Sequence, residues 1–226
     1  MQPRSIRMHV PSLVAGAVLA LAFLAAPTGR AGEDDWRPLA GWTAAGGGEV
    51  PPNWRISGGD IGHTPGGGDL VSIETFANFE LAFDWRVAPG GNSGVMYRVG
   101  GGSGAPFERG PEYQILDNAG HPDGRNPLTS AASAYGLYAP SADVTRPGGE
   151  WNSARILVDG AHVEHWLNGT MVLAYELGSA DWDKRVAASK FASLPDYGRA
   201  PEGHISLQDH GSVVDYRNMR VRILAD

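Results

Sequence analysis

Hydrophobic and polar residues alternate along much of this chain. In the clearest stretch, residues 80–87, Leu81, Phe83, Trp85 and Val87 point to one side, and charged or small residues point to the other. A period of two over eight residues predicts a half-buried β-strand. Similar short segments continue to the C-terminus. We expect further strands at 69–75, 94–99, 112–117, 154–158, 162–167, 171–176, 204–208 and 213–223.

Turn signals separate these segments. Asn168-Gly169 supplies the two positive-φ residues of a type I′ hairpin turn between two predicted strands. No segment shows helical periodicity over ten residues or more. The 32 glycines, 16 prolines and 19% charged residues suit many short strands joined by turns. The pattern therefore predicts an all-β fold in which two antiparallel sheets pack face to face as a β-sandwich.

The first residues predict an export signal. Arg4 and Arg7 precede an apolar run of 14 residues, 13–26, and small residues follow it. This run is short for a membrane-spanning helix, so we predict a secretory signal peptide at 1–31, with an uncleaved anchor as the alternative. The remaining domain, 32–226, would be exported to the periplasm or secreted, without membrane contact.

Charge and cysteine content exclude several classes of partner and chemistry. Loss of Arg4, Arg7 and Arg30 with the signal would change the formal charge from −7 to −10. An acidic chain lacks the basic surface of a nucleic-acid binder, so we expect no nucleic-acid partner and consider a small neutral saccharide instead. The chain has no cysteine, which excludes disulfides, thiolate zinc sites and thiol nucleophiles.

The first candidate for chemistry lies at 112–117. A strand there places Glu112, Gln114 and Leu116 on one face. Burying a carboxyl and an amide without partners costs several kcal/mol, so this face is either exposed surface or a site. Glucanases of two-sheet folds use a second carboxylate two strand positions away or more. Gln114 occupies that position here, which disfavours ordinary two-carboxylate hydrolysis.

The second candidate lies at 203–211. Strand alternation would place His204, Ser206, Gln208 and His210 on one face. Histidine can act as a base, an acid or a metal ligand near neutral pH. We therefore predict a site that combines Glu112 with this strand. A divalent cation held by Glu112, His204 and His210 stays an open alternative, because no local ligand spacing establishes it.

Other polar residues carry weaker signals. Asn92 and Arg98 follow a Gly-Gly turn at 90–91 that would let backbone approach a ligand, although a plain turn before a strand explains it equally well. Lys190 could stabilise an oxyanion or be a solvated surface lysine. His165 shares a strand face with two apolar residues, as a core histidine would.

Together these motifs resemble the 3-keto-disaccharide hydrolase family, whose members have a concanavalin A-like sandwich fold. They occur in the family's order over nearly the whole mature chain. One departure is a shortened opening segment at 38–42. The motifs that carry the resemblance are 79–81, 90–95 with Arg98, 112–118, 150–152, 164–169, 189–191, 203–205 with 207–211, and 216–218.

The resemblance implies an enzyme that cleaves the glycosidic bond of 3-keto-glycosides. A ketone at C3 acidifies the C2 hydrogen, so a base can remove it, the C1 aglycone can leave, and water can add afterwards. Glu112 and His210 would transfer the protons, and a divalent cation could polarise the ketone. The residues that would bind the substrate are Asn92, Arg98, Gln114, Asp117, His165, Lys190 and Gln208.

Two other functions remain open from the sequence. The first is a carbohydrate-binding module with the same fold and no turnover, and the pair Glu112 and His210 argues against it. The second is a conventional glycosidase that acts on unoxidised sugars, and Gln114 argues against that.

Overall fold

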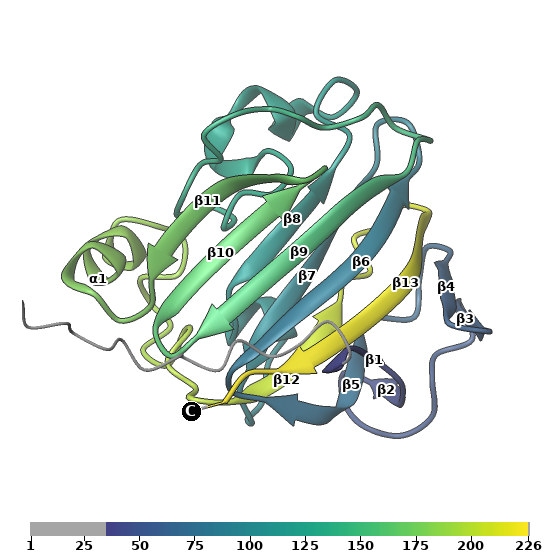
Figure 1. Cartoon of the computed structure of the whole chain (residues 1–226), viewed down its shortest axis with the longest axis horizontal. Helices are drawn as coiled ribbons and strands as arrows, with labels where there is room; N and C mark the ends of the chain where they lie inside the picture. The colour runs from purple at the N-terminus through teal and green to yellow at the C-terminus, as the bar shows by residue number, and fades with distance from the viewer. Residues whose placement is uncertain (1–34, 226) are drawn as a thin grey trace, which may run out of the picture. The chain divides into compact units, whose positions relative to one another are not determined.

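Two antiparallel β-sheets packed face to face make up the fold (Figure 1). The structure is a computed structural model that describes residues 35–225, so the predicted signal peptide at 1–31 lies outside the described residues. The prediction of an all-β sandwich is confirmed. Among the described residues, no helix has the length and apolar character needed to cross a bilayer.

The larger layer, sheet A, has eight strands within residues 35–225. Seven follow the order β11-β10-β9-β6-β13-β4-β3, and β1 also pairs with β13. The strands are β1 (Arg37–Pro38), β3 (Trp54–Ser57), β4 (Asp60–His63), β6 (Phe79–Val87), β9 (Asn152–Asp159), β10 (His162–Leu167), β11 (Thr170–Glu176) and β13 (Val214–Ile223).

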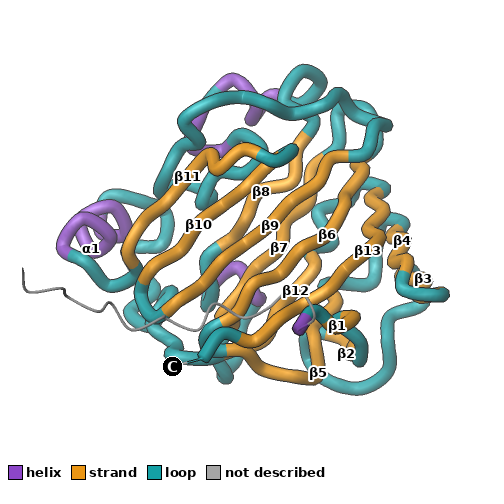
Figure 2. Tube along the Cα trace, in the orientation of Figure 1, coloured by secondary structure: helices purple, strands orange, loops and turns teal. Residues whose placement is uncertain are grey.

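The smaller layer, sheet B, follows the order β2-β5-β12-β7-β8. Its strands are β2 (Trp42–Ala44), β5 (Leu70–Phe76), β7 (Asn92–Val99), β8 (Glu112–Leu116) and β12 (Gly203–Leu207). Helix α1 (Ala180–Ala187) lies to the side of the strands (Figure 2). The short 3-10 helices are η2 (Pro106–Glu108), η3 (Pro122–Arg125) and η4 (Pro127–Thr129).

The core lies between the two sheets and follows the alternation of the sequence. On β6, the residues Leu81, Phe83, Trp85 and Val87 are at most 2% exposed. Burial of such side chains is the main favourable contribution to folding, about 1.5–3 kcal/mol for each one. All of the strands predicted at 69–223 are present, with ends that differ by at most two residues.

The β10–β11 hairpin also agrees with its prediction. Asn168 and Gly169 have φ values of 49° and 81°, as the type I′ turn requires. By contrast, the four N-terminal strands β1 to β4 were not predicted. They are two to four residues long, too short to show a period, and Gly41 (φ 85°) turns the chain between the first two.

Candidate active site

Glu112 is a buried carboxyl at the first residue of β8. Tyr113 and Ile115 belong to the core, so alternation places Glu112 and Gln114 on the outer face of sheet B. Glu112 is nevertheless only 5% exposed, and the backbone N–H of Tyr135 donates to its carbonyl oxygen at 3.1 Å. The alternative of an exposed outer face is therefore wrong at this position.

A glycine on the neighbouring strand makes room for this carboxyl. Gly94 of β7 pairs with Gln114. A Cβ atom at Gly94 would lie 2.2 Å from Glu112 Oε1 and 2.8 Å from its Cδ. The carboxyl thus rests directly over the backbone of β7.

Replacing Gly94 by Ala should displace the Glu112 carboxyl rather than unfold the sheet. The clash involves the end of a side chain, and the φ of Gly94 is not in the left-handed region. We expect the catalytic rate of the site to fall about tenfold or more while the melting temperature changes by a few degrees. Kinetics and thermal unfolding measured on one preparation test this, and an unchanged rate would contradict it.

Burial dominates the electrostatics of Glu112. Loss of hydration raises its pKa from 4.5 to about 8, with Lys190 lowering the pKa and Asp69 raising it further. A carboxyl with this pKa is mostly protonated at pH 7, and its ionised form is a far stronger base than an ordinary carboxylate.

Lys190 brings a positive charge to the same region. Its ammonium lies 4.2 Å from the ring centroid of Tyr135, 5.1 Å from that of Phe191 and 5.5 Å from that of Phe107. Such contacts hold a cation over the negative faces of aromatic rings. The structure therefore brings together Glu112 and Lys190, which are far apart in sequence.

The side-chain amide of Gln114 lies between Glu112 and Asn92. In one orientation its nitrogen donates to Asn92 Oδ1 and to the carbonyl oxygen of Thr129, both at 3.3 Å. In the other it donates to Glu112 Oε1 and to the carbonyl oxygen of Ser93, both at 3.0 Å. The second arrangement is the better one for an ionised Glu112, because a carboxylate can only accept hydrogen bonds.

Gln208 lies between the strand on which Glu112 rests and an open cavity, whose lining includes Gln208 but not Glu112. Its backbone N–H donates to the carbonyl oxygen of Gly94 at 2.9 Å, directly beneath the Glu112 carboxyl. Its side-chain oxygen is buried and accepts no hydrogen bond from the described residues. Gln208 lines a cavity of about 370 Å³, with His210 and Phe107 on its walls. An unpaired acceptor at a cavity wall is suited to a substrate hydroxyl.

Asp69 and Asp209 shape the same cavity. Asp209 accepts backbone hydrogen bonds from Gly66 and Gly68, at 3.0 and 3.1 Å, and fixes that loop. Asp69 accepts a bond from the backbone N–H of Asp209 at 2.8 Å. Burial raises the pKa of Asp69 to about 6, against the lowering effect of that hydrogen bond.

Arg98 and Asp117 are held away from the cavity by structural contacts. The Arg98 guanidinium donates to the carbonyl oxygen of Ala77 at 3.1 and 2.9 Å and to Asn78 Oδ1 at 3.3 Å. Asp117 accepts from the backbone N–H of Gly90 at 2.7 Å. Burial would raise the pKa of Asp117, but several backbone N–H groups together lower it. Both side chains stabilise turns, and neither lines the cavity beside Gln208.

His165 lies in the core. It has no exposed surface, its Nδ1 lies 2.9 Å from the carbonyl oxygen of Ala132, and its Nε2 lies 2.9 Å from the hydroxyl of Tyr97. Burial lowers the pKa of His165 to about 4. Because both ring nitrogens are bonded between the sheets, the prediction that His165 binds substrate is wrong.

The predicted metal ligands do not converge. A bulge between His204 and Ser206 interrupts the alternation of β12, and His204 Nδ1 lies 2.8 Å from the carbonyl oxygen of Ser72. Within residues 35–225, no three His, Asp or Glu side chains are placed to hold a metal ion. Glu112, His204 and His210 therefore do not form the metal site that the sequence left open.

Phe107, Tyr135 and Asp69 were missed as site residues. Phe107 lies in the short 3-10 helix η2 and Tyr135 in a turn, and neither element has a periodic pattern, so no sequence signal points to them. The sequence predicts Asp69 only as the first residue of the strand at 69–75. A carboxyl immediately before an apolar strand was the available signal.

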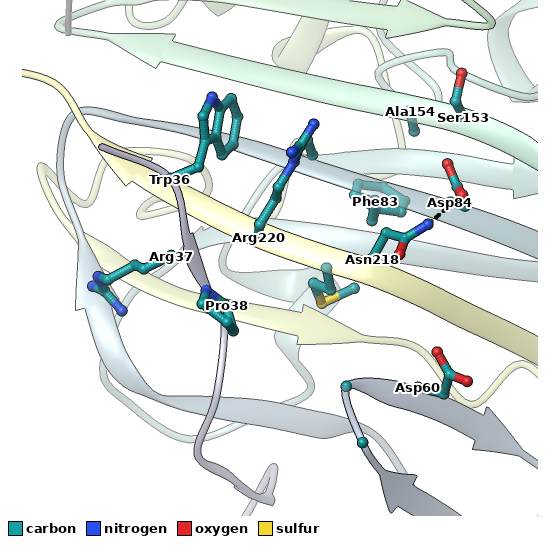
Figure 3. Close-up of a pocket in the computed structure, with 14 residues that line it drawn as sticks. Trp36, Arg37, Pro38, Asp60, Phe83, Asp84, Ser153, Ala154, Asn218 and Arg220 are labelled. Carbon is teal, nitrogen blue, oxygen red and sulfur yellow. Dashed lines mark hydrogen bonds between the residues drawn. The ribbon is translucent and has the colours of Figure 1, made fainter. Parts of the chain in front are cut away.

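A larger cavity, of about 570 Å³, lies on the outer face of sheet A (Figure 3). It contains two carboxyls, those of Asp60 and Asp84, and neither residue is buried as Glu112 is. Without such loss of hydration, a carboxylate is a weak base. We therefore place the candidate active site at Glu112 and the cavity beside Gln208.

Comparison with known proteins agrees with the motifs of the sequence. Residues 35–222 match the family described as the 3-keto-alpha-glucoside-1,2-lyase-like domain. The chain belongs to this family. A relative from Bacteroides thetaiotaomicron, named 3-keto-disaccharide hydrolase, is 36% identical over 222 residues, covering 84% of this chain and 77% of the relative. The prediction of a carbohydrate-active enzyme family is thus confirmed.

Solved structures of Parabacteroides distasonis proteins share the fold. One, described as a proposed glycosyl hydrolase, is 33% identical with a TM-score of 0.79, over 85% of this chain and 95% of that chain. A second, with the same description, is 25% identical with a TM-score of 0.69, over 84% and 99% of the two chains.

Proposed function

We propose that this enzyme cleaves the glycosidic bond of 3-keto-disaccharides and related 3-keto-glycosides by elimination followed by hydration. The main support is Glu112, a buried carboxyl whose pKa is raised to about 8 and whose neighbour on the same face of β8, Gln114, is an amide. Such a group suits proton transfer from carbon better than it suits the paired-carboxylate mechanism. The name of the Bacteroides relative supports the same substrate class.

The reaction proceeds through an enolate. A base takes the C2 proton, and the C–H electron pair forms a C2–C3 double bond with the negative charge on the C3 oxygen. The C3 ketone then re-forms, the electron pair of the C2–C3 double bond moves to form a C1–C2 double bond, and the C1–O bond breaks. The departing oxygen keeps the C1–O electron pair and takes a proton. Addition of water across C1 and C2 completes a net hydrolysis.

In this proposal each residue of the site has one task. Ionised Glu112 is the base at C2, and Lys190 stabilises the enolate oxygen. The unpaired oxygen of Gln208 accepts a hydrogen bond from a sugar hydroxyl. His210, exposed on the cavity wall, supplies the proton to the departing oxygen. The rate of proton removal from C2 should therefore rise with pH through about 8, the pKa of Glu112.

One assay separates this function from its two competitors. Purified protein is given a 3-keto-glucoside and, in parallel, the same glucoside unoxidised, each with and without a chelator. We expect cleavage of the keto sugar alone. Cleavage of neither sugar would indicate a binding module, and cleavage of the unoxidised sugar would indicate a conventional glycosidase. The chelator shows whether turnover needs a metal.

A substitution at Asp69 also distinguishes the elimination mechanism from conventional glycoside hydrolysis. A conventional glycosidase at this site would need Asp69 as the partner of Glu112, because it is the other carboxyl that contributes to the raised pKa of Glu112. Asp69→Asn should then abolish cleavage. In the elimination mechanism it should lower the rate only modestly, through the Asp209 loop.

Gln114 should set the pH at which Glu112 becomes active. Gln114→Met removes an N–H that can donate to the ionised carboxyl at 3.0 Å. Hydrogen bonds to charged groups contribute about 1.5–3 kcal/mol, so the acid limb of kcat should move up by about one to two pH units. A pH–rate profile tests this, and an unchanged midpoint would mean that the amide bonds to Asn92 instead.

We also propose that the protein is exported. The positively charged start and short apolar run of residues 1–31 support this. Cell fractionation and N-terminal sequencing of the mature protein test it. Recovery of the full-length chain from the cytoplasm would contradict it.

A further inference from the structure

The cavity on the outer face of sheet A is separate from the Glu112 site. Its floor is formed by β6, β9 and β13, and its walls by β1 and the β3–β4 turn. Its volume of about 570 Å³ is within the range of small-molecule sites. Glu112 lies on the outer face of the other sheet, so this cavity has no part in the proposed chemistry.

An irregular strand shapes the floor. The pairing of β13 with β6 shifts between Arg217 and Arg220, and Asn218 within this bulge has a φ of 54°. A non-glycine residue in the left-handed region costs free energy and persists where surrounding contacts require it. Because the bulge inserts an extra residue, side chains there no longer alternate between the two faces of the sheet. Bulges with this effect are frequent beside binding sites.

The bulge fixes a carboxylate at the floor. Asp84 Oδ2 accepts from Asn218 Nδ2 at 2.9 Å and from Arg217 Nε at 3.1 Å. The guanidinium of Arg217 in turn stacks on Trp151, with its central carbon 4.1 Å from the ring centroid. Figure 3 shows Asn218 and Asp84 joined by this hydrogen bond. The floor is thus a rigid polar platform rather than a set of free surface side chains.

The rim adds an indole ring and charges of both signs. Trp36 of the N-terminal segment stands beside Arg220, whose guanidinium carbon is 5.1 Å from the Trp36 ring centroid. Asp60, the first residue of β4, lies across the cavity (Figure 3). Two charged side chains of the lining already have partners, because Arg37 pairs with Glu74 and Asp84 pairs with Arg217. The other two, Arg220 and Asp60, carry opposite charges, so the cavity has no net formal charge. A charged ligand is therefore not favoured.

We propose that this cavity is a second, non-catalytic binding site for a neutral saccharide unit. Each sugar hydroxyl both donates and accepts, which matches a cavity that offers carboxylate acceptors beside amide and guanidinium donors. The indole of Trp36 offers apolar surface to the C–H groups of the ring. The enzyme would hold a glycan on one sheet while the other sheet carries out the reaction.

Binding without turnover tests this proposal. Maltohexaose and cellohexaose, both neutral and unoxidised, are titrated into the protein by isothermal calorimetry. We expect saturable binding of at least one of them, weakened about tenfold or more by Trp36→Ala and by Asp60→Asn. Asn218→Gly should also weaken it while keeping the left-handed backbone that the bulge requires.

Two controls make the result specific. Trp166 also lies on sheet A with an arginine, Arg155, 3.9 Å from its ring centroid, but it does not line the cavity. Trp166→Ala and Glu112→Gln should each leave the affinity within about twofold. Absence of saturable binding, equal losses in the two tryptophan variants, or loss in Glu112→Gln alone would overturn the proposal. None of these outcomes depends on whether the Glu112 site cleaves 3-keto-sugars.

Discussion

Replacing Glu112 by Gln should lower kcat on a 3-keto-glucoside by about 10³-fold. The amide keeps the size of the side chain but cannot take a proton from C2, and a positioned general base contributes about 10²–10⁴ in rate. Single-turnover kinetics check this at a pH above 8, where the wild-type carboxyl is mostly ionised. A rate within tenfold of wild type would show that another group is the base.

The same variant should be more stable than the wild type at alkaline pH. Glu112 has a folded-state pKa of about 8 against an ordinary pKa of 4.5, so the folded state binds the proton more tightly than the unfolded state. Its contribution to stability therefore falls as pH rises from about 4.5 to about 8. The amide that replaces the carboxyl in the variant has no proton to lose, so the stability advantage of the variant should grow over this window.

Thermal unfolding at pH 5 and pH 9 measures that difference. Glu202→Gln is a matched control, because it makes the same chemical change at an exposed carboxyl that keeps its hydration. We expect the control to follow the wild type. If Glu112→Gln also followed the wild type at both pH values, the carboxyl would not be desolvated as the structure indicates.

The regular parts of the fold could be predicted because their physics is local. Period-two alternation on β6 and the Asn168-Gly169 turn each depend on a few adjacent residues, and the structure contains both. The face shared by Glu112 and Gln114 follows from the same alternation. By contrast, β12 breaks its alternation at a bulge, which no local pattern signals.

The residues of the site could not all be predicted, because their positions depend on contacts between segments that are distant in sequence. Arg98 has a φ of 48°, and its guanidinium donates to the carbonyl oxygen of Ala77. Strand alternation alone therefore does not predict where this guanidinium lies. His165 was ambiguous because a core histidine and a binding histidine occupy the same strand position. Only packing against Tyr97 decides between them. The burial of Glu112 likewise comes from loops with no periodic signal.

Replacing Lys190 by Met should lower kcat by about 10²-fold. In the proposed reaction its ammonium stabilises the enolate oxygen, and removal of one such preorganised donor typically costs about 10²–10³ in rate. Lys190 also lowers the pKa of Glu112. Its loss should therefore move the acid limb of the pH–rate profile upward, so that the ionised base forms only at still higher pH.

The chain provides a matched control, because its two lysines are Lys184 and Lys190. Both side chains are exposed, but the described contacts place only the ammonium of Lys190 over Tyr135, at 4.2 Å. Lys184→Met removes the same charge from the protein and should leave rate and pH profile unchanged. Lys190→Arg keeps the charge and should recover the pH midpoint more fully than kcat, since a guanidinium presents different donors. Equal profiles for the two methionine variants would mean that Lys190 acts only through the net charge of the surface.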